Sequence, residues 1–222
     1  MSSASTPVAG WRSAEVEAEM PALRLLLAEV DVGRGGSLTG PSPPDIRMRL
    51  RERSSRFRGA RAVNIRREPV AGAYRVFFRH IGLDPDVVRT PIEAAVLERM
   101  LRGGFTSYGL LADVLLLALA DTSVPVWALD ARAVQGRPGI RASVEGEPLG
   151  CAGDAPPLLG GQLVVADAAC VLARLFEEPA PPLAPSGDAE RLVLYAVQVP
   201  GVPALYAEEA LWCAASALEA HD

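Results

Sequence analysis

Hydrophobic spacing divides the chain into a mainly helical first half and a second half rich in strands. The strongest helical pattern runs from Val70 to Ile81, where apolar side chains recur every three or four residues. Gly82 ends this helix. Residues 90–102 begin with Thr-Pro-Ile-Glu, a capping box with proline at the first helical position. This second helix is expected to end at the glycine pair 103–104.

Four more helices are predicted from their caps and their apolar spacing. They cover residues 13–20, 45–57, 107–120 and 203–219, with Ser13, Asp45 and Ser107 as N-caps of the first three. The last helix is expected to bury Leu205, Leu211 and Leu218.

Short apolar runs rich in β-branched residues predict the strands. These cover residues 23–32 and 60–65, and then 124–129, 140–144, 163–166, 170–175 and 191–199. Helices and strands are therefore segregated along the chain, which indicates an α+β fold rather than a doubly wound sheet. We expect a flexible N-terminus over residues 1–12 and one domain over residues 13–220.

Arginine supplies all 22 basic residues, and half of them lie between Asp45 and His80. Eleven arginines stand there against three acids, in a protein whose net charge is −5. On the helix predicted over residues 45–57 and just beyond it, Arg47, Arg49, Arg53, Arg56 and Arg58 are candidate RNA-binding residues. A solvated helix face paired with acids is an equally good interpretation. The exclusive use of arginine is typical of compositional bias, so the clustering is the informative feature.

Several classes of function lack their usual signals. Two histidines and three cysteines without a CxxC pair predict no metal site and no cofactor. The odd number of thiols favours a reducing cytosol over a disulfide scaffold. The longest apolar run, residues 109–120, is too short to span a membrane, and residues 1–12 lack the core of a secretory signal. We therefore expect a cytoplasmic protein that does not bind membranes.

A set of charged residues in the second half provides candidate site chemistry, namely Asp113, Asp130, Arg141 and Glu147. Asp113 lies among leucines, where a carboxylate is costly to bury unless it is paired or hydrogen-bonded. A buried Asp113–Arg141 pair that holds the sheet in place is one interpretation, and a ligand site is the other. No complete catalytic motif accompanies these residues.

The order of several short motifs resembles the B3/B4 domain, which occurs in the β subunit of phenylalanyl-tRNA synthetase and as stand-alone proteins. The motifs are Tyr74-Arg75, Gly82-Leu83-Asp84-Pro85, Glu93-Ala94, Arg102-Gly103-Gly104, Ala112-Asp113, Pro125-Val126-Trp127-Ala128-Leu129-Asp130, Gly139-Ile140-Arg141 and Gly146-Glu147. The similarity covers residues 13–220 and is closest to the stand-alone group. It implies a three-layer α+β arrangement that contains a β-sandwich.

In the synthetase this domain is an editing module, which hydrolyses tyrosine mischarged on phenylalanine tRNA. The resemblance implies ligand-binding roles for Asp113, Trp127, Asp130, Arg141 and Glu147. Trp127 stands where the editing domain has a histidine, and an indole cannot act as a general base. Leu116 replaces an asparagine, and residues 168–171 replace a glycine-rich stretch. No catalytic residue is therefore assigned, and the domain cannot aminoacylate by itself.

Three functions follow as hypotheses. The first is RNA or tRNA binding, in which the arginines contact phosphates and the hollow at Trp127 holds the aminoacylated end. The second is hydrolysis of mischarged aminoacyl-tRNA in trans. The third is binding of a small molecule such as an amino acid or a nucleoside. The first hypothesis requires the arginines before position 80 and the hollow at Trp127 to lie on one face of the protein.

Overall fold

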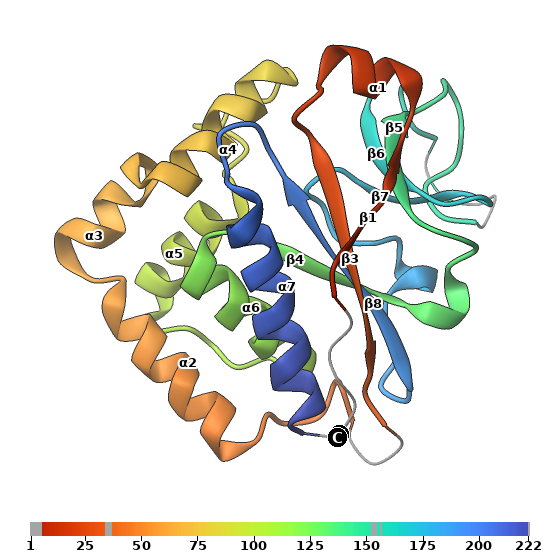
Figure 1. Cartoon of the computed structure of the whole chain (residues 1–222). Coiled ribbons are helices and arrows are strands. Elements are labelled where there is room, and N and C mark those ends of the chain that lie inside the picture. Colours follow the sequence, from red (N-terminus) through yellow and green to blue (C-terminus); the bar gives the residue numbers. More distant parts are fainter. Residues whose placement is uncertain (1–5, 34–36, 152–154, 156, 222) are drawn as a thin grey trace.

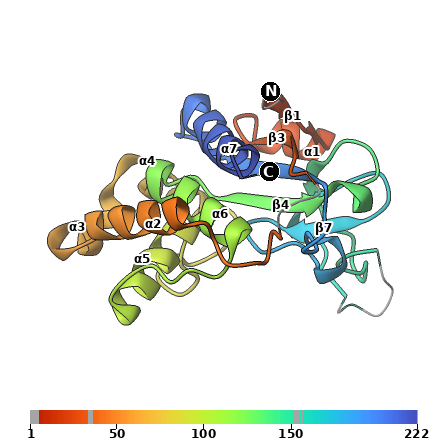
Figure 2. The same cartoon turned by 90° about the horizontal axis from the view of Figure 1, so that it is seen from below.

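Two four-stranded sheets and a group of helices make up the protein, as described by a computed structural model for residues 6–33, 37–151, 155 and 157–221 (Figure 1). The α+β class is as expected. In both views, most of the helices lie on one side of the first sheet and the second sheet lies on the other side (Figures 1 and 2). Within the described residues, no helix is long and apolar enough to cross a membrane.

The first sheet has the strand order β1-β3-β8-β4, and all neighbouring strands are antiparallel. Its strands are β1 (Val8–Ala9), β3 (Arg24–Asp31), β8 (Arg191–Gln198) and β4 (Val126–Asp130). β3 and β8 pair along their whole length, from Arg24 opposite Gln198 to Asp31 opposite Arg191. Most of their residues are buried on both faces, which explains why their sequences are continuous apolar runs.

The second sheet has the order β2-β5-β6-β7. Its strands are β2 (Trp11–Arg12), β5 (Gly139–Ala142), β6 (Leu163–Ala166) and β7 (Val171–Arg174). A Cβ atom at Gly139 would overlap the indole of Trp11, so only glycine allows β2 to approach this closely. Ile140, Val165 and Leu172 belong to the same buried cluster as the core of the first sheet.

The N-terminal segment belongs to the domain, contrary to the boundary expected at residue 13. Residues 8–12 supply an edge strand to each sheet, and the indole N–H of Trp11 donates to the carbonyl of Arg137 at 2.7 Å. Two-residue strands are too short to leave a periodic pattern, so their pairing could not be seen in the sequence. Residues 1–5, which were included in that prediction, lie outside the described residues.

Helices cover the first sheet in successive layers. α7 (Ala204–Glu219) packs on β3 and β8, α6 (Leu110–Thr122) packs on α7, and α2 (Pro44–Arg56) packs on α6. The others are α1 (Ala14–Glu19), α3 (Gly59–Asn64), α4 (Pro69–His80) and α5 (Pro91–Arg102), with short 3₁₀ turns at Ile65–Arg67, Ala131–Ala133 and Pro181–Leu183. Figure 2 shows α7 on one side of α6 and α5 on the other.

Several local predictions are confirmed. α4 buries Val70, Tyr74, Phe77 and Phe78, and the capping box of α5 forms both of its hydrogen bonds. The strands predicted over residues 23–32, 163–166 and 191–199 match β3, β6 and β8 within one or two residues.

Other local predictions are wrong for identifiable reasons. Residues 60–65 lie in α3 and the turn after it, because the buried positions Ala62 and Ile65 are three residues apart. The proline pair 43–44 starts α2, so Asp45 lies in its first turn rather than at its N-cap. Leu205 is 68 % exposed on α7.

A disulfide joins Cys151 to Cys170, which was not expected. The two residues are separated by 19 positions in the sequence and meet only because the chain folds back at β6 and β7. Because two of the three cysteines are paired, the odd number of cysteines does not indicate a reducing compartment.

Tyr74 provides a test of how α4 is attached to the sheet. Its hydroxyl is buried and donates to the carbonyl of Val197 in β8 at 2.7 Å. We expect Tyr74→Phe to lower the free energy of unfolding by about 1 kcal/mol, because the carbonyl loses its buried donor while the packing is kept. Urea unfolding measures the change. An unchanged midpoint would show that this hydrogen bond does not stabilise the fold.

Candidate functional site

A cavity of about 750 Å³ lies beside Trp127, where four segments of the chain meet. We call it the Trp127 cavity. Its walls come from β4, from one face of α6, from the start of α5 and from residues 176–185. Leucine, proline and alanine side chains make up most of the lining, and Arg89, Glu177 and Glu178 provide the charged groups. A largely apolar hollow with a few charged groups is the usual composition of a small-molecule site.

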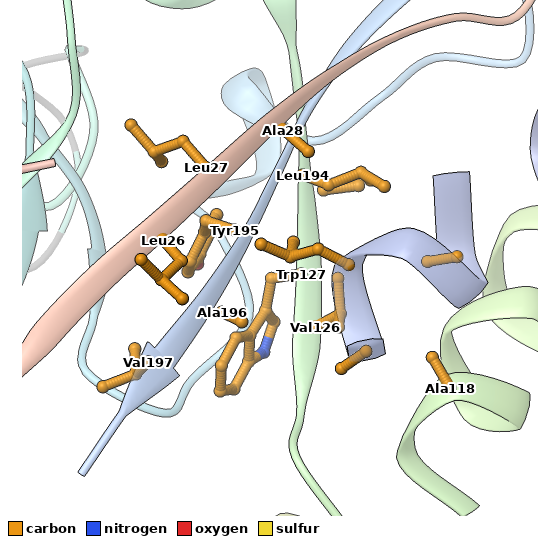
Figure 3. Packing of buried hydrophobic residues seen from close by; sticks show 14 of the residues in the cluster. Leu26, Leu27, Ala28, Ala118, Val126, Trp127, Leu194, Tyr195, Ala196 and Val197 are labelled. Atoms are coloured by element: carbon orange, nitrogen blue, oxygen red, sulfur yellow. The ribbon is translucent and has the colours of Figure 1, made fainter. Parts of the chain in front are cut away.

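Pairing between β4 and β8 determines the position of Trp127. Trp127 lies opposite Tyr195 in the register, and the two rings stack with centroids 5.4 Å apart and an interplanar angle of 18° (Figure 3). Only 5 % of Trp127 is exposed. The indole is therefore held firmly by the sheet and can contribute a fixed aromatic surface to the cavity.

Phe176 also lines the cavity and has an unusual backbone conformation. Its φ is 69°, in the left-handed region that bulky residues rarely adopt. Its ring contacts Trp127 at 6.3 Å between centroids and Phe78 at 4.9 Å. Backbone strain of this kind is found most often at functional sites, where the surrounding packing maintains it.

The hydroxyl of Tyr195 is buried behind Trp127 and has no hydrogen-bond partner among the described residues. Tyr195 is 1 % exposed, and its burial raises the pKa of the phenol well above its ordinary value. The negative charge of Glu178 raises this pKa further, which shows that the carboxylate is within electrostatic reach of the phenol. A buried unpaired hydroxyl carries a desolvation cost that calls for an explanation.

Glu178 lines the cavity, and the pKa of its carboxyl group is raised above the ordinary value. Its side chain is exposed to solvent by surface area, and partial desolvation by the surrounding chain raises the pKa of its carboxyl. Within the described residues Glu178 has no ion pair, whereas its neighbour Glu177 contacts Arg174 at 3.2 Å. Arg89 likewise has no ion pair in the described part of the chain and is exposed at the edge of the cavity.

Of the five ligand-binding residues expected from the sequence, only Trp127 lines this cavity. Asp113 is 1 % exposed and accepts hydrogen bonds from the hydroxyls of Ser42 and Ser107 and from the backbone N–H of Tyr108. Ser107 therefore binds Asp113 instead of capping α6. The buried Asp113–Arg141 pair does not form. Asp113 instead ties the segment before α2 to the start of α6.

The other three predicted ligand residues form local ion pairs. Asp130 accepts from Arg132 at 2.8 Å, and this guanidinium lowers the pKa of its carboxyl. Arg141 binds Glu147 in the second sheet with two hydrogen bonds of 2.8 Å, and this contact lowers the pKa of Glu147. Their charges are thus satisfied within the protein.

Arg53 and Arg56 of α2 are held on a different face from the Trp127 cavity, and no arginine of α2 lines it. Arg53 contacts Asp121 of α6, and Arg56 lies 3.9 Å from the same carboxylate. Asp121 is two residues beyond Leu119, which lines the cavity, and so points about 200° away around α6. Arg47, Arg49 and Arg58 have no ion pair within 4 Å in the described part of the chain.

Other arginines lie closer to the cavity. A smaller groove of about 260 Å³ between α3 and α5 is lined by Arg66 and Arg89, and Arg89 lines both hollows. Sequence reasoning missed Arg89, Phe176 and Glu178. The only available signal was that a pair of glutamates stands in a proline-rich connector, where charges are usually solvated.

Among the described residues, no group of three or more histidine, cysteine or acidic side chains could hold a metal ion. No protein-family model matches the chain, and no curated protein is significantly similar to it. The resemblance to the B3/B4 domain therefore stays a prediction.

Asp113 provides a test that separates a structural role from a ligand-binding one. Asp113→Ala should lower the free energy of unfolding by about 3 kcal/mol, because three donors lose one buried acceptor. Asp113→Asn, which keeps one oxygen, should cost less. Chemical unfolding of both variants measures the effect, and a stable Asp113→Ala protein would contradict this structural assignment.

Proposed function

We propose that the chain binds an amino acid, or a small molecule built from one, in the Trp127 cavity. The observation that carries the proposal is a charged acid and a charged base, Glu178 and Arg89, both without ion pairs in the described residues, at one largely apolar hollow. An amino acid has a matching ammonium group, a matching carboxylate and a side chain for the apolar walls.

The apolar part of the ligand would lie against Trp127 and the leucines of α6, which offer area without polar competition. The ammonium group would interact with Glu178, since hydrogen bonds to an ionised carboxylate are stronger than those between neutral groups. Arg89 would bind the carboxylate at the exposed edge.

Binding is favoured over hydrolysis because Trp127 cannot take a proton where the related editing domain has a histidine. The identification of the fold as a three-layer B3/B4-like domain is part of this proposal, as is a cytoplasmic location. The two packed sheets and the ordered series of motifs support the family likeness.

Ligand binding can be followed through the fluorescence of Trp127 alone in a W11F/W212F variant. We expect one or more free amino acids to quench this signal, with little dependence on salt. Glu178→Gln should weaken binding about tenfold or more, because the ligand ammonium loses its charged acceptor. Binding should strengthen as the pH rises through the elevated pKa of Glu178, because only the ionised carboxyl attracts an ammonium group.

Glu177→Gln is the matched control, since Glu177 is next in sequence and already contacts Arg174. Calorimetry on the wild-type chain checks that the fluorescence change reports binding. The proposal fails if no amino acid binds, or if Glu178→Gln and Glu177→Gln have the same affinity.

RNA binding is a second candidate, and the position of Arg66 and Arg89 on the two adjoining grooves favours it. The aminoacylated end of a tRNA would then enter the Trp127 cavity with its phosphates on these two arginines. This mode of RNA binding uses Arg66 and Arg89 and does not require the arginines of α2.

Salt titration of tRNA binding tests this candidate. We expect the logarithm of the affinity to fall linearly with the logarithm of the salt concentration, since bound arginines release counterions. R66A/R89A should reduce this slope by about 1.4, at about 0.7 for each contact with a single strand. R53A/R56A is the control and should leave it unchanged. Absent or salt-independent binding would rule out this candidate.

A further inference from the structure

The outer edge of β4 borders the Trp127 cavity and has no neighbouring strand among the described residues. β4 is the last strand of the first sheet, and β8 pairs with it on one side only. Three successive residues of β4, Val126, Trp127 and Ala128, line the cavity together with leucines of α6. Figure 3 shows β4 between β8 and the helix that carries Ala118, which is α6. The main chain of an edge strand is therefore part of the cavity wall.

The register of the first sheet determines which main-chain groups of β4 point to this edge. The amide of Val32, just after β3, donates to the carbonyl of Glu190, just before β8. The main chain turns to opposite sides at successive residues, so even-numbered residues of β3 face β8 and odd-numbered residues of β8 face β4. Trp127 and Leu129 lie opposite odd-numbered residues of β8 and therefore make the hydrogen bonds between β4 and β8.

Val126 and Ala128 consequently turn their N–H and C=O groups away from β8. Tyr74 supports this assignment, because its hydroxyl reaches the carbonyl of Val197 on the β4 side of β8, where Pro125 has no N–H to donate. Val126 and Ala128 are 6 % and 5 % exposed. Within the described part of the chain, no group forms a hydrogen bond with their outward main chain. Because buried main-chain groups are nearly always paired, these donors and acceptors are suited to a ligand.

An extended main chain is the ligand that matches this pattern. Val126 and Ala128 each present one donor and one acceptor, and they lie about 6.8 Å apart along the strand. A single amino acid has one main-chain nitrogen and one carboxylate, so it can satisfy only one of the two residues. A peptide repeats its donors and acceptors at the same spacing and can pair with both, as an added strand does at an exposed sheet edge. The cavity of about 750 Å³ has room for such a ligand.

We propose that the Trp127 cavity takes a short peptide, whose extended main chain pairs with Val126 and Ala128 as an added strand of the first sheet. This inference rests on the proposed function and specifies its ligand as a peptide of at least three residues. The N-terminal ammonium group keeps the role given to Glu178, and the apolar side chains lie against Trp127 and the leucines of α6. A nucleoside has no repeating main chain and would leave the edge unpaired.

Amide hydrogen exchange of the full chain, followed by NMR, tests the pairing. In the free chain we expect the amides of Val126 and Ala128 to exchange about tenfold faster, or more, than those of Trp127 and Leu129, which are bonded to β8. The probes are trialanine, trileucine and triphenylalanine. At saturation, at least one of them should slow exchange at Val126 and Ala128 about tenfold or more. Equal exchange at all four amides of the free chain overturns the proposal, as does the failure of every tripeptide to protect Ala128.

N-methylation of the tripeptide that binds gives a matched pair of ligands, because successive N–H groups of an extended chain point in opposite directions. Methylating the peptide nitrogen that faces β4 should weaken binding about tenfold or more, and methylating the other should leave the affinity nearly unchanged. Calorimetry measures both. Equal effects of the two methyl groups would contradict the added strand.

Ala128→Pro tests the same hydrogen bond from the side of the protein. Proline is tolerated on an edge strand where the N–H faces away from the sheet, so the ladder with β8 is kept, and circular dichroism checks the fold. Tripeptide binding should weaken about tenfold, and an unchanged affinity would overturn the inference. If free amino acids bind and tripeptides do not, the proposed function stands and the peptide assignment falls. If neither binds, both fall.

Discussion

The pairing of β3 with β8 is the interaction on which the rest of the structure depends. Eight residues of each strand are in register, and the strands are buried on both faces over most of that length. The charged residues Arg24, Asp31 and Arg191 lie at the ends of the ladder. A shift along the strands would draw these charges into the core, so the register is strongly determined. β1 and β4 then extend this pair at its two edges, and the β4 edge brings Trp127 against Tyr195.

Sequence reasoning succeeded where the determining contacts are local. The capping box of α5 and the apolar face of α4 depend on residues a few positions apart, and both were predicted correctly. It failed where the partners are distant. Asp113 is bound by Ser42, which is 71 residues away, and β2 pairs with β5 across more than 120 residues. No periodic pattern carries that information, because these contacts arise only when the sheets have assembled.

Charge clustering shows the same limit for the candidate site. The arginines of residues 45–80 are concentrated in the sequence, but folding spreads them over different surfaces and pairs several with acids. Arg75 binds Asp86 and Glu93, Arg61 binds Glu68, and Arg53 binds Asp121. A net charge counted along the chain is therefore a weak guide to the charge of a face. Arg89, which lies outside this cluster, is the arginine that lines the cavity.

Two departures from ordinary packing occur together beside the Trp127 cavity. Phe176 has a left-handed backbone conformation without being a glycine, and the hydroxyl of Tyr195 is buried without a partner among the described residues. Each is unfavourable for folding alone, at roughly 1–3 kcal/mol. Both residues contact Trp127, and Glu178 acts on Tyr195 through its charge. Both departures border the hollow that we propose as the ligand site, and strain that the surrounding packing maintains is found most often at functional sites.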